Sequence, residues 1–116
     1  MSIERIGAGP RMSKAVVHGD TVYLAGQVAD QTKGKSVAEQ TGEILGIIDS
    51  LLSQAGSDKT KILSATIWLS DISTFTEMNS KWDAWVVQGS TPARATVQAQ
   101  LAAPEYKVEI AVIAAK

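Results

Sequence analysis

The chain has 116 residues, with 11 lysines and arginines against 12 aspartates and glutamates, and a pI of about 5.7. This length predicts one domain, residues 1–116, with a core of its own, and the near-neutral charge does not favour nucleic acid or anionic membranes as partners. The absence of cysteine excludes disulfides and thiol chemistry. No metal-ligand spacing is present, and no apolar stretch approaches a membrane-spanning length, so we expect a cytoplasmic protein.

The first part of the chain predicts short strands. Residues 3–6 are compatible with an edge strand, and residues 14–18 and 21–26 are β-rich runs separated by Gly19-Asp20, which is typical of a hairpin turn. The polar residues 27–35 then predict a surface loop.

A long amphipathic helix is predicted next. Ser36 and Glu39 have the spacing of a capping box, and Gly56 is placed to end the helix. The apolar positions between them recur on one stripe: Val37, Thr41, Ile44, Leu45, Ile48, Leu51, Leu52 and Ala55.

The second half predicts a strand, a helix and two strands. Residues 61–70 alternate, with Leu63, Ala65, Ile67 and Leu69 on one side. Asp71 or Ser73 can cap a second helix that stops at Gly89. Core packing is the favoured interpretation of its apolar residues, which are Ile72, Phe75, Met78, Trp82, Trp85 and Val86. Strands are predicted over residues 91–101 and 106–115, with a turn at 102–105.

This order predicts an α+β fold in which two helices cover one face of a mixed sheet. The other face is expected to carry Thr66, Trp68, Arg94, Thr96, Gln98, Glu109, Ala111 and Ile113. Because Trp68 and Ile113 are too apolar for a solvent face, we expect a homo-oligomer packed through it.

Arg94 is a fixed cation with no carboxylate within ten residues on either side. In its strand Ala95, Val97, Ala99 and Leu101 form the expected core face, and Arg94 shares the other face with uncharged polar residues. A planar fork of donors there suits bidentate binding of a small carboxylate. A pairing with an acidic residue on a neighbouring strand or subunit is an equally open interpretation.

Glu109, on the last strand, has the half-buried placement of a carboxylate that could hold or activate water. The alternative is a salt bridge to Arg94 or Lys107. Spacing alone predicts that Asn79 is a solvated helix residue. His18 is the only histidine and lies beside a predicted turn, so we do not favour it as a base.

The chain resembles the RidA family, also called the YjgF or Rid family, over nearly its whole length. The resemblance rests on Ser13 to Val16, Val22 to Gln27, Phe75 to Trp85, Pro92 to Val97, Leu101, Pro104 and Val108-Glu109-Ile110. Residues 82–87 and 106–109 are more similar to the YoaB-type branch than to the archetypal deaminases.

The resemblance implies a chorismate-mutase-like fold assembled as a homotrimer with clefts between subunits. It also implies cofactor-free hydrolysis of 2-imino acids to 2-keto acids and ammonia. In that scheme Arg94 clamps the substrate carboxylate, Glu109 positions the attacking water, and Asn79 and Gly26 correspond to the family's cleft asparagine and glycine.

Three cleft positions differ from the family pattern. Met12 stands for a tyrosine (or Arg11 takes that place if the loop register slips), Ala25 stands for a serine, and Thr96 stands for a cysteine. Losing one positioned donor can lower a rate by roughly two to three orders of magnitude. The alternative function is therefore a non-catalytic trimeric module that binds small carboxylates such as 2-keto acids. A ribonuclease or translation inhibitor, labels that family members have carried, is disfavoured by the acidic pI and the lack of a basic stripe.

Overall fold

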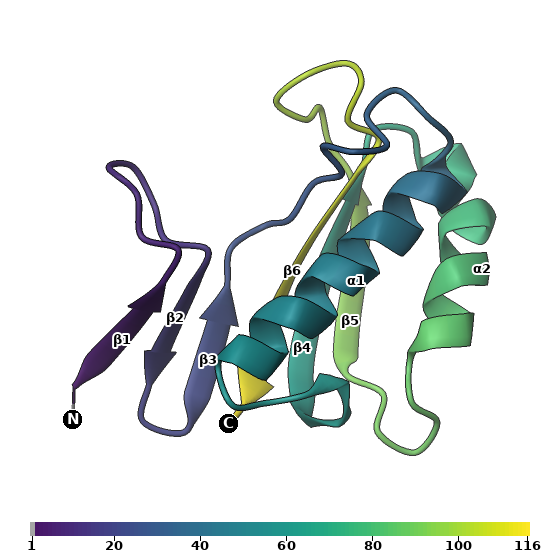
Figure 1. Ribbon diagram of the computed structural model, residues 1–116. Helices are drawn as coiled ribbons and strands as arrows, with labels where there is room; N and C mark the ends of the chain where they lie inside the picture. Colours follow the sequence, from purple (N-terminus) through teal and green to yellow (C-terminus); the bar gives the residue numbers. More distant parts are fainter. Residues whose placement is uncertain (1) are drawn as a thin grey trace.

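The computed structural model describes residues 2–116 and consists of one six-stranded sheet with both long helices packed on one face (Figure 1). This confirms the predicted α+β class. The elements in chain order are β1 (Ile3–Ile6), β2 (Ala15–His18), β3 (Thr21–Leu24), α1 (Val37–Gln54), η1 (Lys59–Lys61), β4 (Ile62–Leu69), η2 (Ile72–Thr74), α2 (Phe75–Trp85), β5 (Ala93–Gln98) and β6 (Val108–Ala115).

The strands lie in the order β1-β2-β3-β6-β4-β5, so the C-terminal strand β6 is central and β5 forms an edge. All pairs are antiparallel except β4 and β5, which are parallel and joined through α2. A parallel pair needs such a crossover, because its strands cannot be joined by a tight turn. No helix within residues 2–116 is long and apolar enough to cross a membrane.

The core lies between α1 and the helix-covered side of the sheet, which we call the helix face. Every residue of the predicted α1 stripe is buried, and Ser36 caps the helix by accepting a hydrogen bond from the Glu39 N–H. Gly56 follows the helix end with a φ of 81°, a conformation that favours glycine. The prediction of this helix, its cap and its end is confirmed.

Outside β5, three apolar residues predicted to face the core are exposed, namely Leu63, Ile72 and Phe75. Leu63 lies outside the core because a β-bulge between Ile62 and Ser64 shifts the alternation of β4, so that Ile62 is buried in its place. Phe75 is exposed at the first turn of α2, which is preceded by a separate turn, η2, capped by Asp71. Asp71 thus acts as a cap, as predicted, but it caps η2 and not α2.

The opposite side of the sheet, which we call the open face, has no covering layer among residues 2–116. Trp68 lies opposite Glu109 on this face, Thr66 opposite Ala111, and Ser64 opposite Ile113, as the predicted face requires. The fold measures 43 × 38 × 21 Å, and the short axis has room only for one sheet and one helix layer. Apolar side chains therefore remain exposed there, namely Tyr23, Val97 and Ile113.

The predicted facing of β5 is wrong. Arg94, Thr96 and Gln98 lie opposite Ala65, Ile67 and Leu69 of β4, which are buried on the helix face, and residues directly opposite on paired strands share a face. Ala95 and Val97 consequently lie on the open face, where Val97 is 46% exposed. The polar side of this edge strand therefore faces α2.

Candidate functional site

Arg94 is held beneath α2 by three side chains. Its Nη1 donates a 2.8 Å hydrogen bond to Asn79 Oδ1, and its guanidinium carbon lies 5.1 Å from the Trp82 ring centroid and 5.6 Å from that of Phe75. Cations are attracted to aromatic ring faces at such distances. The guanidinium is thus restrained from several sides before any ligand is present.

The spacing along α2 explains this arrangement. Phe75, Asn79 and Trp82 are separated by four and three residues, so they lie on one face of the helix, the face turned toward β5. The expectation that Asn79 is simply solvated is wrong, because its side chain is half-buried against Arg94. The sequence signal that could have predicted this position is the spacing of Phe75 and Trp82, four residues before and three residues after Asn79.

The bonded partner of Arg94 is a neutral amide, so the bond to Asn79 leaves the positive charge unneutralised. The guanidinium carries a fork of N–H donors, and Asn79 occupies one of them. A pairing of Arg94 with Glu109 inside one chain is excluded, because the two residues lie on opposite faces of the sheet. The remaining donors can bind an external anion.

Glu109 lies on β6 in the middle of the open face, directly opposite Trp68 of β4. Burial raises the pKa of its carboxyl group above the ordinary value. A salt bridge with Lys107 or another cation would lower the pKa, so the direction of the shift argues against the ion-pair interpretation. The carboxyl group thus keeps its proton to a higher pH than a fully solvated one.

Gly26 is placed against Glu109. A Cβ atom on Gly26 would overlap the Glu109 carboxylate, so a residue with a side chain cannot occupy this position unless the carboxylate moves. Glycine allows such close approach of a backbone to another group. The structure brings together Gly26 and Glu109, two of the residues predicted for the site, from segments 83 positions apart (109 − 26).

Met12 and Gly26 also line a common pocket of about 460 Å³, together with Lys14, Gln27 and residues of α1. Met12 is 55% exposed, and Arg11 is not part of the pocket lining. Ala25 is half-buried beside it and donates its N–H to the Lys14 carbonyl. Their participation in substrate binding stays a prediction.

Thr96 follows Arg94 by two residues and shares its face of β5. Its Oγ1 is buried and has no hydrogen-bond partner within residues 2–116. A buried hydroxyl without a partner is uncommon. It is therefore an unsatisfied hydroxyl enclosed within the chain, two residues along β5 from Arg94.

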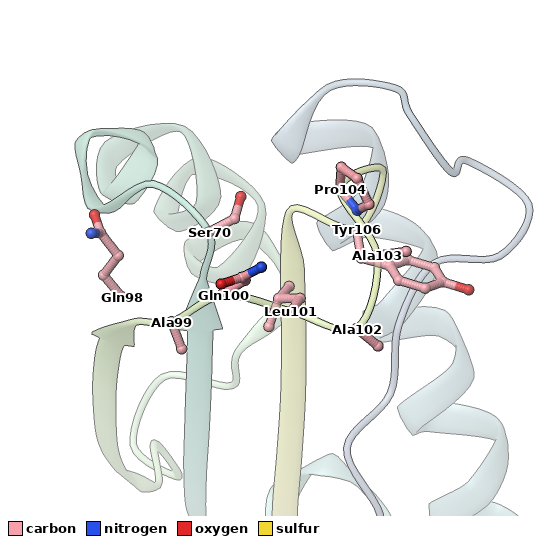
Figure 2. Close-up of a pocket in the computed structure, with 9 residues that line it drawn as sticks. All are labelled: Ser70, Gln98, Ala99, Gln100, Leu101, Ala102, Ala103, Pro104 and Tyr106. Atoms are coloured by element: carbon pink, nitrogen blue, oxygen red, sulfur yellow. The ribbon is translucent and has the colours of Figure 1, made fainter.

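A further cavity, which the sequence did not predict, lies at the carboxyl ends of the parallel strands β4 and β5 (Figure 2). Its volume is about 540 Å³, and it is lined by Ser70 after β4, Gln98 at the end of β5, residues 99–104 and Tyr106. Figure 2 shows the Gln100 side chain between Ser70 and Leu101, and the Tyr106 ring pointing away from the loop. All polar side chains of this lining are uncharged, so the cavity lacks the cation that a carboxylate requires.

Comparison with known proteins gives the family. Residues 2–116 match the sequence profile described as Endoribonuclease L-PSP. The chain belongs to this family, the RidA or YjgF family. Among residues 2–116, no group of three or more His, Cys, Asp or Glu side chains could hold a metal ion.

RidA-family relatives match the chain over almost its full length. The RutC family protein YoaB of Escherichia coli strain K12 is 47% identical over 115 residues, covering 99% of each chain, which confirms the YoaB-like character. The crystal structure of NMB1025, a YjgF-family protein of Neisseria meningitidis, superposes with a TM-score of 0.96 at 46% identity, covering 100% of this chain and 96% of that one. A Bos taurus protein named 2-iminobutanoate/2-iminopropanoate deaminase is 36% identical over 107 residues, covering 88% of this chain and 77% of its own.

Proposed function

We propose that the protein hydrolyses 2-imino acids to 2-keto acids and ammonia, in clefts between the subunits of a homotrimer. The observation that carries the proposal is the Arg94 guanidinium, which is held by Asn79, Phe75 and Trp82 and bonded to a neutral partner. The name of the 36% identical Bos taurus relative supports the same reaction class.

Arg94 binds the substrate carboxylate. Its fork of donors matches the two oxygens of a carboxylate, and the rings of Phe75 and Trp82 limit its rotation, so less side-chain freedom is lost on binding. Thr96 lies on the same face of β5, but its hydroxyl is buried and does not face the anion site. A small 2-imino acid carries the required carboxylate next to the reacting carbon.

Glu109 acts on water. In the proposed reaction it takes a proton from water as the oxygen attacks the C=N carbon and passes that proton to the nitrogen, which gives a carbinolamine. It then moves the proton of the new hydroxyl group to the nitrogen as the C=O bond forms, the C–N bond breaks and ammonia leaves. A carboxyl group with a raised pKa is a stronger base than an ordinary carboxylate and suits both transfers. No oxidant, reductant or cofactor is needed for the balance.

Two subunits are needed to complete this site. Arg94 faces α2 whereas Glu109 lies on the open face, so one chain cannot present both to one small molecule. A second copy packed on the open face would cover Trp68 and Val97, and it would bring its own Glu109 to the β5 edge beside Arg94. Closing a ring of three copies gives three equivalent clefts.

Ammonia release from freshly generated 2-iminopropanoate tests the proposal. We expect wild-type protein to accelerate release, and we expect Arg94→Ala and Glu109→Gln each to lower the rate by about 100-fold or more. Arg5→Ala is the matched control, because Arg5 is an exposed arginine on β1, at the other end of the sheet. Lack of acceleration by wild type, in an assay where a known deaminase is active, would contradict the proposal.

A second function, binding of small carboxylates without turnover, is favoured by Met12 and Ala25, which offer no polar side-chain group beside Gly26. Calorimetry with 2-ketobutyrate distinguishes the two functions. Binding by wild type that is lost in Arg94→Ala, together with no ammonia release, would identify a binding module. Absence of binding by wild type rejects it.

A further inference from the structure

Gln40 is a polar residue in the core of the protein. It lies in the first turns of α1 with 0% of its surface exposed. Its Nε2 donates to the carbonyl oxygens of Glu105 at 2.8 Å and Lys35 at 3.2 Å, and its Oε1 accepts from the Lys107 N–H at 2.9 Å. One side chain therefore joins the helix to two loops that are about 70 residues apart.

Those two loops adjoin Gly26 and Glu109, the two residues that lie against each other in the site. Residues 27–35 continue directly from Gly26, and residues 105–107 lead directly into β6 and Glu109. The loops are joined to each other as well, because Gly34 N–H donates to the Glu105 carbonyl at 3.1 Å and the Tyr106 hydroxyl donates to Asp30.

The sheet alone holds this region weakly. The regular pairing of β3 with β6 ends at Tyr23 opposite Ile113. Beyond it, the chain is paired with β6 only through the isolated bridge between Gln27 and Ile110. Trp68 of β4 pairs with Glu109 on the other side of β6. This pairing positions β6 relative to β4, but it does not position Gly26.

We propose that Gln40 is a positioning residue that holds the Gly26 segment against the Glu109 strand and so sets the space in which water meets the Glu109 carboxylate. The inference rests on the proposed function for its catalytic consequence. Packing does not explain the residue, since a leucine or methionine of similar size would fill the core without a buried amide. All three hydrogen bonds of the amide go to the loops that flank the site.

Gln40→Met tests the role, because methionine retains the length of the side chain and removes its hydrogen bonds. The matched control is Thr41→Val, since Thr41 is equally buried on the same helix but donates only within it, to the Val37 carbonyl. In ammonia release from 2-iminopropanoate we expect Gln40→Met to lower kcat by about 10- to 100-fold, the scale of a misplacement near 1 Å. KM should change by less than about threefold, because Arg94 binds the carboxylate elsewhere.

A structural readout separates this inference from the proposed function. In amide hydrogen exchange the Gln27 and Ile110 amides, which bond each other's carbonyls, should exchange about tenfold faster in Gln40→Met than in a Thr41→Val protein of equal stability. Tyr106→Phe, a milder change that removes a surface bond between the same loops, should shift both readouts in the same direction. Unchanged exchange at Gln27 and Ile110 in Gln40→Met overturns the inference, whatever the activity. If the wild type is active and Gln40→Met has an unchanged kcat, the inference is also overturned. If the wild type is inactive, only the proposed reaction is contradicted, and the exchange rates alone test the role of Gln40.

Discussion

Arg94 and Glu109 lie on opposite faces of one sheet, Arg94 beneath α2 on the edge strand β5 and Glu109 beside Trp68 on the central strand β6. Both are the kind of residue that hydrolysis of a small acid requires, yet one chain keeps them apart. Quaternary assembly is therefore part of the proposed chemistry: in the proposal, the site is completed where the open face of one copy meets the β5 edge of another.

Mixed trimers should regain activity that neither parent variant has. If Arg94 and Glu109 come from different subunits, a cleft between an Arg94→Ala subunit and a Glu109→Gln subunit can still contain both intact residues. Random mixing at equal amounts should restore about a quarter of the wild-type clefts. Ammonia release after joint unfolding and refolding of the two variants measures the recovery.

The control for this experiment is the double variant Arg94→Ala/Glu109→Gln mixed with either single variant. In such a mixture one of the two residues is replaced in every subunit. No cleft can then contain both Arg94 and Glu109. Recovery in the first mixture and none in the second supports a composite cleft. No recovery in either mixture, with trimers verified by light scattering, means that each site draws both residues from a single chain.

Gly26→Ala should displace the Glu109 side chain, because the new methyl group overlaps its carboxylate. The overlapping atoms are the end of a flexible side chain that can move, so we expect a loss of about 1 kcal/mol or less in the free energy of unfolding, measured by urea denaturation. Gly46→Ala is the matched control. Gly46 lies within α1 with nothing within 4 Å of an added Cβ, so alanine there should stabilise the helix by about 0.5–1 kcal/mol.

The same comparison isolates the cause of the Gly26 effect. If the overlap with the carboxylate is responsible, the double variant Gly26→Ala/Glu109→Ala should recover much of the lost stability, since the obstructing atoms are gone. An equally unstable double variant would show instead that Gly26 is required for its own backbone conformation.

The parts of the fold governed by local rules could be predicted from the sequence. The α1 cap at Ser36, the stripe from Val37 to Ala55 and the stop at Gly56 follow from helix geometry and are confirmed. The placement of Trp68 and Glu109 on the open face followed from simple alternation along their strands, whereas their direct pairing is seen only in the fold.

The facing of β5 could not be predicted this way. Alternation identifies two faces of a strand but does not say which of them meets the helices, and the apolar half was assigned to the core by default. In the fold Val97 lies on the open face, because β5 is an edge strand and α2 covers it with Asn79 and two aromatic rings. The role of Gln40 was equally hidden, since its partners are backbone groups far away in sequence.

The raised pKa of Glu109 predicts a pH-dependent cost to stability. Burial favours the protonated form in the folded state, so the folded protein binds more protons than the unfolded chain between the two pKa values. Stability contributed by this group therefore falls as pH rises through the ordinary glutamate value of 4.5. Glu109→Gln should be more stable than wild type at pH 7, and the difference should disappear below that value. Urea denaturation at pH 4 and pH 7 measures it, and a constant difference at both would contradict burial as the cause.

Asn79→Ala should weaken carboxylate binding without removing the cation. The Asn79 amide oxygen accepts from Arg94, so its loss frees the guanidinium to adopt other rotamers, and a hydrogen bond to a charged group contributes about 1.5–3 kcal/mol. We expect the Kd for 2-ketobutyrate to rise by about tenfold, less than in Arg94→Ala, because Phe75 and Trp82 still flank the guanidinium. Ser80→Ala is the control, since Ser80 is the next residue of α2 but is exposed and donates only to the Glu77 carbonyl. Equal affinities of the Asn79 and Ser80 variants in calorimetry would show that Asn79 does not orient Arg94 for binding.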